Sequence, residues 1–352
     1  MEHPNISSFG CMPDGAPVYA VTLKNDILSC RVITFGAALQ ALFVPDREGT
    51  PTDIVLGFDS LAQYLSEKGC LGATVGRVAN RIAHGQFTLN GIQYTLPINN
   101  GNHHLHGGTP GFSHRVWEID AVSETAVTLS LSAKDMEQGY PGNMKVTATY
   151  ILDGNRLTLR HTAICDADTL CSMTNHTYFN LSGHHSGNAM AQQLQLFAET
   201  FTPSDPEAIP YGRIESVSGT PMDFSILHPI GQDIDAPYHQ LVQGKGYDHN
   251  YVVSGQPGNL RPAAFAVSPD TGITMAVETT MPGLQLYTGN YLTENMEGKG
   301  GFLYGPRHGF CLETQYFPDA VNHPEFPSPI LPENTPYDHT TAFIFSAENP
   351  CK

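Results

Sequence analysis

The stretch QFTLNGIQYTL, residues 86–96, shows the pattern that decides the fold. Apolar and polar side chains alternate on both sides of Asn90-Gly91, and this dipeptide is the preferred loop of a two-residue type I′ hairpin. Turn chemistry and alternation therefore agree on a β-hairpin. The cross-strand pairs that this register predicts are Leu89 with Ile92, Phe87 with Tyr94, and Thr88 with Gln93.

The same period of two residues recurs along the chain. It is clear at 127–132 and 146–152, and a turn at Asp153-Gly154-Asn155 leads into further alternation. Strands separated by turns every eight to twelve residues or so are typical of a sandwich or barrel. Helical signals are few, and the main one is SLAQYLSEK, residues 60–68, with Ser60 as the N-cap. We therefore expect an all-β fold with few short helices.

Length and composition favour one large domain. A chain of 352 residues corresponds to about two average domains, but all-β sandwiches often reach about 250 residues or more as one unit. The loop-rich stretch 202–246 carries apolar anchors such as Phe224 and Leu227, and no change in composition marks a linker. We interpret this stretch as long ordered loops over a single β-sandwich domain that spans residues 1–352.

The charge balance excludes several classes of partner. Lys and Arg number 17 against 34 Asp and Glu, which gives a net charge of −17. Nucleic acids and anionic membrane surfaces bind basic faces, so we expect neither as a partner, and we expect a neutral or cationic substrate. The N-terminal residues do not have the pattern of a signal peptide, and no apolar run is long enough to span a membrane. Seven cysteines without CxxC spacing predict reduced thiols and a cytoplasmic location.

Two polar clusters contain histidines that could transfer protons. They are NNGNHHLHGG, with His106, and TNHTYFNLSG, with His176. Histidine titrates near pH 6.5, so it can give and take protons at neutral pH; a structural histidine bonded to the backbone is the alternative at both positions. His104 would share a face with His106 in a strand, and an H-x-H pair can bind zinc. However, no Cys, Asp or Glu lies within ten residues of either to complete a metal site.

Glu313 is the residue that is hardest to explain as scaffold. It lies in the apolar run FCLETQYF, residues 310–317. Glutamate is almost never buried without a partner, and burial raises the pKa of a carboxyl group toward the range that a general base needs. Gln285 interrupts a similar apolar run in PGLQLYTGNYL. There it either hydrogen-bonds a ligand or holds Glu313.

Two further clusters suit the binding of hydroxyl groups. GRVANRIAHG brings together Arg77, Asn80 and Arg81, and arginine presents a planar fork of donors. The alternative for this cluster is an ion pair between sheet and loop. In GKGYDHNYV, Asp248 either accepts hydrogen bonds from ligand hydroxyls or forms an Asx-turn. The residues alone thus predict an acidic, β-rich protein with a His–carboxylate pair for acid–base chemistry and groups that bind hydroxyls.

Together these motifs resemble the aldose 1-epimerase family, the galactose mutarotases. The likeness covers nearly the whole chain, including ITFGAALQALFVPDREG, GRVANRI, HLHGG, GYPGN, TNHTYFNLSG, PGLQLYTGN and CLETQYFPDAVNHPEFPSPIL. It implies a large single-domain β-sandwich with an open cleft. It also implies an enzyme that interconverts the α and β anomers of free aldohexoses such as galactose and glucose, without a cofactor or metal.

The resemblance also implies roles for individual residues. Glu313 in LETQ resembles the general base, His176 in TNH the general acid, and His106 in LHGG a second histidine at the ring oxygen. The substrate-binding residues that it implies are Asn80, Arg81, Asp248 and Gln285. His103 and His104 precede LHGG where the family often has smaller or amide residues, so the contacts at the rim of the cleft depart from the family pattern.

Three alternatives remain beside this interpretation. A hexose-6-phosphate epimerase of the same fold would need extra Arg or Lys to hold a dianion, which the net charge of −17 disfavours. A non-catalytic sugar-binding protein would lack the acid or the base. A metal-dependent hydrolase would use His103, His104 and His106. The preferred aldose stays open, and the protein is expected to be a monomer or a homodimer.

Overall fold

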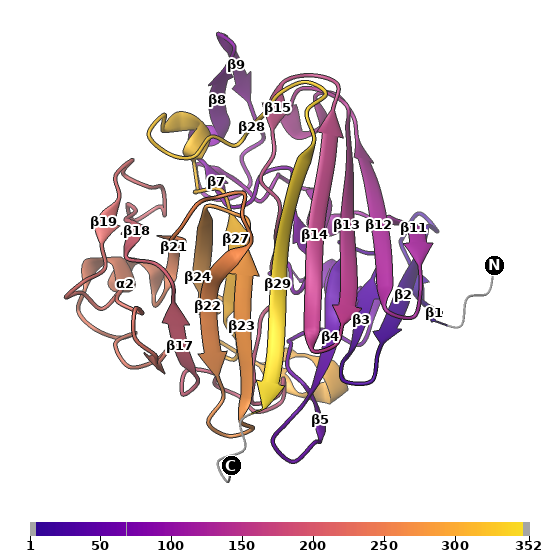
Figure 1. The fold of residues 1–352 in the computed structure, drawn as a ribbon. Coiled ribbons are helices and arrows are strands. Elements are labelled where there is room, and N and C mark those ends of the chain that lie inside the picture. The colour runs from indigo at the N-terminus through magenta and orange to yellow at the C-terminus, as the bar shows by residue number, and fades with distance from the viewer. Residues whose placement is uncertain (1–4, 68, 348–352) are drawn as a thin grey trace.

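The computed structural model describes residues 5–67 and 69–347. These residues form mostly β-strands, and the α-helices among them are two short ones, α1 (Leu61–Ser66) and α2 (His239–Gly244). The prediction of an all-β fold with few short helices is therefore confirmed (Figure 1).

An antiparallel sheet of nine strands forms the largest layer. In spatial order its strands are β11 (Glu118–Val122), β12 (Ala126–Ala133), β13 (Met144–Asp153), β14 (Arg156–Cys165), β29 (Tyr337–Ala347), β23 (Ile273–Thr279), β22 (Arg261–Val267), β17 (Gln193–Leu196) and β20 (His228–Pro229). β29, near the end of the chain, pairs with both β14 and β23, so strands from both halves of the chain share this sheet. The single-domain interpretation itself stays a prediction.

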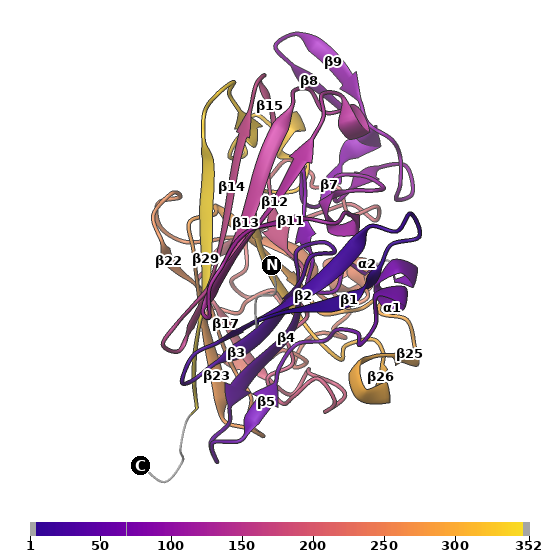
Figure 2. The same ribbon diagram turned by 90° about the vertical axis from the view of Figure 1, so that its right-hand side faces the viewer.

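Two sheets of five strands complete the sandwich. One contains β1 (Ile6–Cys11), β2 (Pro17–Lys24), β3 (Ser29–Ile33), β4 (Ala38–Pro45) and β5 (Pro51–Asp53), and Figure 2 shows it on one side of the nine-stranded sheet. The other, in spatial order, contains β19 (Glu215–Ser216), β18 (Thr200–Thr202), β21 (Asp248–Val252), β24 (Gly283–Tyr287) and β27 (Cys311–Gln315). One hydrophobic core joins all three sheets, because it includes Leu129 of β12, Val32 of β3 and Leu286 of β24.

Short ladders and turns connect these layers. The two-stranded ladders are β8 (Gln86–Leu89) with β9 (Ile92–Thr95), β7 (Arg81–Ile82) with β10 (His104–Leu105), β6 (Thr74–Val75) with β16 (Thr174–Asn175), β15 (Thr169–Leu170) with β28 (Ile330–Leu331), and β25 (Met296–Glu297) with β26 (Leu303–Tyr304). The 3₁₀ turns are η1 (Ala83–Gly85), η2 (Phe112–His114), η3 (Glu137–Gly139), η4 (Lys299–Gly301) and η5 (Ala320–Asn322).

The predicted hairpin is confirmed in every pair that the sequence indicated. Asn90 and Gly91 have φ angles of 52° and 78°, as a type I′ turn requires at both central positions. The rings of Phe87 and Tyr94 stack with their centroids 5.1 Å apart. On β8 burial follows the alternation, because Phe87 and Leu89 are buried, whereas Ile92 on β9 is 58% exposed.

The other local predictions gave the right type of secondary structure, but not always its bounds. On β13 the alternate side chains from Val146 to Leu152 are buried, as expected. Helix α1 begins after Ser60, whose hydroxyl forms a capping box with Gln63. It ends at Ser66 because Glu67 is extended, and the predicted end, Lys68, lies outside the described residues. The stretch 202–246 is mostly loop, but it also contains α2, β19 and β20, which the sequence analysis missed.

Two findings concern the cysteines and the helices. The six cysteines among residues 5–67 and 69–347 form no disulfide with one another. No helix in that part of the chain has the length and apolar character needed to cross a membrane.

Two histidines face each other across strands of the large sheet. His161 of β14 lies opposite His339 of β29. Burial lowers the pKa of His161 to about 3 and the pKa of His339 to about 4. Both imidazoles are therefore neutral in the folded protein over most of the acidic range.

We expect the free energy of unfolding to decrease as the pH falls below about 6.5, the ordinary pKa of histidine. Between that pH and about 3 to 4, the unfolded chain binds protons that the folded protein does not, so stability falls as the pH falls. At about pH 5 His161 alone should lower the free energy of unfolding by about 2 kcal/mol, at about 1.4 kcal/mol per pH unit. Urea unfolding at about pH 7 and pH 5 measures this, and His161→Gln should reduce the difference. An unchanged difference in that variant would contradict the assignment.

Candidate active site

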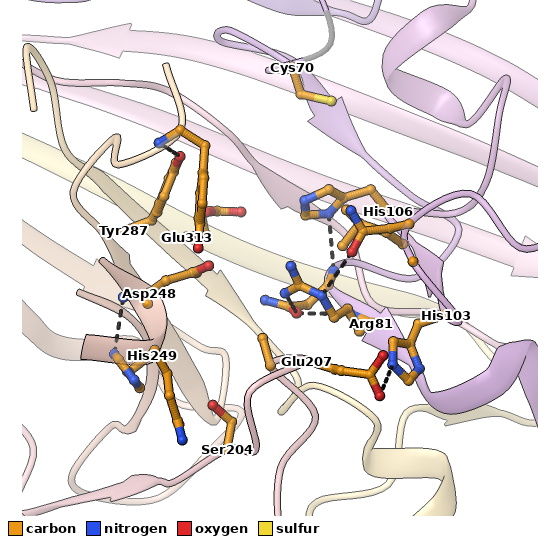
Figure 3. Close-up of a pocket in the computed structure, with 18 of the residues that line it drawn as sticks. Cys70, Arg81, His103, His106, Ser204, Glu207, Asp248, His249, Tyr287 and Glu313 are labelled. Carbon is orange, nitrogen blue, oxygen red and sulfur yellow. Dashed lines mark hydrogen bonds and ion pairs between the residues drawn. The ribbon is translucent and has the colours of Figure 1, made fainter. Parts of the chain in front are cut away.

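A pocket of about 450 Å³ opens where the sheet of β21, β24 and β27 meets the loops at 80–81, 100–106 and 204–208 (Figure 3). Six of the seven predicted site residues line it, namely Asn80, Arg81, His106, His176, Asp248 and Glu313. In Figure 3 Glu313 and Asp248 lie on one wall, and His106 and Arg81 lie on the other. Residues separated by more than 200 positions in sequence thus share one cavity.

The register of the second five-stranded sheet places the polar side chains on one face. Glu313 of β27 pairs with Gln285 of β24, and Cys311 pairs with Tyr287. Asp248 of β21 in turn lies opposite Tyr287. Opposite residues and alternate positions share a face of a sheet. This alternation explains why polar residues interrupt apolar runs here, because Leu284, Leu286 and Leu312 point into the core.

Glu313 is buried, with 2% of its surface exposed. Its Oε1 lies 3.5 Å from Nε2 of His176, and its Oε2 has no hydrogen-bond partner among the described residues. Burial raises the pKa of Glu313 well above its ordinary value; the charge of Asp248 adds to the rise, and that of Arg81 opposes it. The free oxygen can therefore accept a hydrogen bond from a molecule in the pocket.

His176 lies immediately after β16 and is held by its backbone. Its N–H donates to the carbonyl of Ala73, and its own carbonyl accepts from Gly72, at 2.9 Å each. The imidazole stacks on Tyr178 with the ring centroids 5.0 Å apart. Burial lowers the pKa of His176 to about 4, although its own backbone carbonyl and Asp248 act in the opposite direction.

His176 and Glu313 therefore both favour their neutral forms in the folded protein. Burial disfavours both the carboxylate and the imidazolium, so the free pocket favours a neutral pair rather than the ion pair that the acid–base roles require. The neutral pair and the ion pair carry the same net charge. They differ only in whether one proton lies on Oε1 of Glu313 or on Nε2 of His176. A ligand can thus select the ion pair without exchange of a proton with solvent.

His106 is a hydrogen-bond donor in this geometry. Its backbone is left-handed, with φ of 53°, and its Nδ1 accepts a 3.1 Å hydrogen bond from the backbone N–H of Asn80. Because Nδ1 is an acceptor, the neutral ring carries its proton on Nε2. Burial, followed by the nearby His176 and Arg81, lowers the pKa of His106 well below its ordinary value.

Asp248 and Arg81 present opposite charges to the pocket. Arg81 is the one Lys or Arg that lines it among the described residues, and its Nε donates to Asn100. Oδ1 of Asp248 accepts a 2.7 Å hydrogen bond from Nε2 of Gln285. Gln285 is buried and does not line the pocket. In the described structure the side chain of Gln285 supports Asp248 and forms no hydrogen bond with Glu313, and its predicted role in binding a ligand stays a prediction.

Two candidates from the polar clusters lie elsewhere. Arg77 is buried and donates to the carbonyls of Pro141 and Gly142, which is neither a ligand contact nor an ion pair. His104 donates from Nδ1 to the carbonyl of Pro97 and lies outside the pocket lining. His104 and His106 do not share a strand face, because the strand ends at Leu105 before the left-handed His106.

Several lining residues had no clear signal in the sequence. Tyr178 and Tyr287 lie inside the quoted motifs, where they read as apolar positions. Asp205 and Glu207 belong to a loop whose Pro and Asp content resembles any surface turn. Glu207 lies 3.5 Å from Nε2 of His103 and accepts from Asn102, so it connects two loops across the pocket (Figure 3).

Comparison with known proteins gives one consistent result. The family model described as aldose 1-epimerase matches residues 19–343. The galactose mutarotase of Bos taurus is 43% identical over 339 residues, which are 96% of this chain and 97% of that protein. The aldose 1-epimerase of Escherichia coli K12 is 36% identical over 340 residues, with coverage of 96% and 97%.

Solved structures agree in fold over the same extent. The aldose epimerase homologue from C. elegans superposes with a TM-score of 0.86 at 31% identity and covers 94% of this chain and 99% of its own. The galactose 1-epimerase from Lactobacillus acidophilus gives a TM-score of 0.85 at 28% identity, with coverage of 98% and 99%. The predicted galactose mutarotase-like sandwich is thereby confirmed. On the family match and these near full-length relatives, the chain belongs to the aldose 1-epimerase family.

Proposed function

We propose that this protein is an aldose 1-epimerase that interconverts the anomers of free aldohexoses such as galactose and glucose through Glu313 and His176. The observation that carries the proposal is the 3.5 Å approach of these two buried groups at a polar pocket. The pocket volume of about 450 Å³ falls within the usual range for small-molecule sites. The names of the relatives, galactose mutarotase and aldose 1-epimerase, support the same reaction.

The reaction needs one proton acceptor and one proton donor. In the ion-pair form, the carboxylate of Glu313 takes the proton of the C1 hydroxyl while the imidazolium of His176 protonates the ring oxygen. The bond between C1 and the ring oxygen breaks, and C1 becomes an aldehyde. Rotation about C1–C2 presents the other carbonyl face, and reclosure returns both protons. Each proton transfer can contribute about 10²–10⁴ in rate.

The surrounding charges act on both members of the pair. Asp248 stabilises the imidazolium of His176 and makes Glu313 more basic. The Nε2–H of His106 is a second donor for the ring oxygen, and Asn80, Arg81 and Asp248 bind the other hydroxyls. The cytoplasmic location and the monomeric or homodimeric state remain predictions.

Gln285→Leu should raise KM for galactose about tenfold and change kcat less. Gln285 donates to Asp248, and a hydrogen bond to a charged group contributes about 1.5–3 kcal/mol. Initial-rate polarimetry measures both constants. Gln40→Leu is the matched control, because Gln40 is equally buried and donates to the carbonyl of Phe58 outside the pocket. An equal rise of KM in both variants would show only a general loss of structure.

The pocket charges argue against a sugar phosphate as substrate. Among the described residues, the lining of the pocket includes the carboxylates of Asp205, Glu207 and Asp248 against the single guanidinium of Arg81. A phosphate dianion would be repelled, whereas neutral hydroxyls can be bound by groups of either kind.

Polarimetry on freshly dissolved aldoses and their 6-phosphates tests the proposed function. We expect fast mutarotation of free galactose or glucose and much slower conversion of the 6-phosphates. Acceleration of the phosphates alone would favour the sugar-phosphate epimerase. Tight binding of sugars without any acceleration would favour a sugar-binding protein.

A further inference from the structure

A thiol lies beside the acid–base pair at the inner end of the pocket. Cys311 is fully buried on β27, two residues before Glu313 and on the same face of the sheet. Its Sγ lies 3.5 Å from Nδ1 of His176, and Nε2 of the same ring lies 3.5 Å from Oε1 of Glu313. One ligand atom from each of these three residues can be chosen so that all lie within 4.8 Å of one another. Among residues 5–67 and 69–347 no other group of His, Cys, Asp and Glu meets this criterion.

The spacing matches the edges of a tetrahedral zinc site. Zn–S bonds of about 2.3 Å and Zn–N bonds of about 2.0–2.1 Å place sulfur and nitrogen about 3.5 Å apart at a tetrahedral angle. The separation of Sγ and Nδ1 is 3.5 Å. Imidazole, thiolate and carboxylate are also the three donor types that zinc takes in proteins. Sγ faces Nδ1 of His176 whereas Oε1 of Glu313 faces Nε2, and a cation takes only one nitrogen of a ring. The imidazole or the carboxylate must therefore move for all three ligand atoms, which lie within 4.8 Å of one another, to surround one cation.

Two further observations point to a cation. Oε2 of Glu313 is a buried oxygen without a hydrogen-bond partner in the described chain, so the carboxyl group has unused acceptor capacity. The path to the cluster runs through a pocket lined by Asp205, Glu207 and Asp248. A cleft of predominantly negative groups concentrates cations. With three protein ligands, a tetrahedral cation would keep a fourth position for a water molecule.

We propose that His176, Cys311 and Glu313 bind a thiophilic divalent cation such as Zn²⁺, and that the bound cation inhibits the epimerase. Coordination forms bonds from the metal to Sγ, to the imidazole nitrogen and to the carboxylate, and the thiol proton of Cys311 and the carboxyl proton of Glu313 leave to solvent without any redox change. The imidazole lone pair and the carboxylate that should exchange protons with the sugar are then held by the metal. Cation and sugar compete for one site. The inhibition rests on the proposed function, whereas the binding itself does not.

Cobalt binding tests the site without any activity measurement. Co²⁺ added to metal-free protein should give a thiolate-to-cobalt charge-transfer absorption in the wild type. Cys311→Ser should abolish this band. Cys70→Ser should keep it, because Cys70 lines the pocket and does not belong to the cluster of His176, Cys311 and Glu313. A band that persists in Cys311→Ser, or no band in the wild type, overturns the proposal. If Cys311→Ser fails to fold, saturating galactose must displace cobalt from the wild type, and a band unaffected by galactose overturns the proposal equally.

Zinc inhibition tests the consequence for the reaction. After chelation, Zn²⁺ should inhibit the wild type competitively with galactose. Loss of the thiolate ligand in Cys311→Ser should raise the inhibition constant at least about tenfold, with each variant compared with its own metal-free rate. Zinc that activates the enzyme or leaves the rate unchanged overturns the inhibitory role. If no mutarotation is found in any variant, the proposed function fails, and the cobalt spectrum still decides the metal site.

Discussion

Glu313→Gln should lower kcat for mutarotation of α-galactose about 10³-fold while the protein stays folded. The amide keeps the shape of the side chain and can still donate to Nε2 of His176, but it cannot take a proton from the C1 hydroxyl. General base catalysis contributes about 10²–10⁴ in rate. Polarimetry of freshly dissolved α-galactose measures the loss directly.

The same variant should be at least as stable as the wild type near pH 8. The raised pKa of Glu313 means that the unfolded chain releases the carboxyl proton above about pH 4.5 while the folded protein resists release. The free energy of unfolding of the wild type therefore decreases as the pH rises. The amide does not ionise, so the variant lacks this decrease. Glu325→Gln is the control, because Glu325 is half exposed and lies outside the pocket. A wild-type rate in Glu313→Gln would remove the base from the mechanism.

His176→Gln should lower kcat by about 10²-fold or more, because the amide nitrogen can mimic Nε2 in shape but cannot protonate the ring oxygen. The wild type should show a bell-shaped pH dependence of kcat. The singly protonated pair is the active form, so a second proton at low pH or loss of the proton at high pH abolishes the reaction. In His176→Gln only the ionisation of Glu313 remains, so the decline at high pH should disappear.

A double variant sharpens this test. Since His176 and Glu313 share one proton, Glu313→Gln combined with His176→Gln should be little slower than the slower single variant. Multiplication of the two losses would show that the residues act independently. His185→Gln is the control, because His185 is exposed and lies outside the pocket lining.

The local structure was predictable where short-range chemistry decides it. Asn90-Gly91 sets the hairpin, because both residues tolerate the positive φ angles of a type I′ turn. Ser60 begins α1, because its hydroxyl accepts from a backbone N–H that would otherwise lack a partner. The end of α1 and the small elements within 202–246 were missed, because packing against other segments decides them.

The membership of the candidate site was predictable in part, and its arrangement was not. Glu313 was identified because a carboxylate is unfavourable in an apolar strand unless it has a partner or a function. The motifs of the resemblance identified the other predicted site residues. Arg77 and His104 share motifs with site residues but point into the scaffold, where backbone carbonyls bind them. Gln285 lies outside the pocket lining and donates a hydrogen bond to Asp248. Neighbours in sequence diverge in this way because strand pleat and left-handed backbone direct adjacent side chains to different surroundings.

The amino-acid sequence by itself determined that the chain is acidic and rich in strands. It also determined where the turns lie and which polar side chains interrupt apolar runs. Composition and alternation are sufficient for this, because they act within a few residues. Only the tertiary structure decided that His176 meets both Glu313 and Cys311, that burial favours the neutral form of the pair, and that Glu207 reaches His103 across the pocket. Those contacts depend on the register of strands far apart in the chain and on the exclusion of water between packed sheets, and neither is encoded within a short segment.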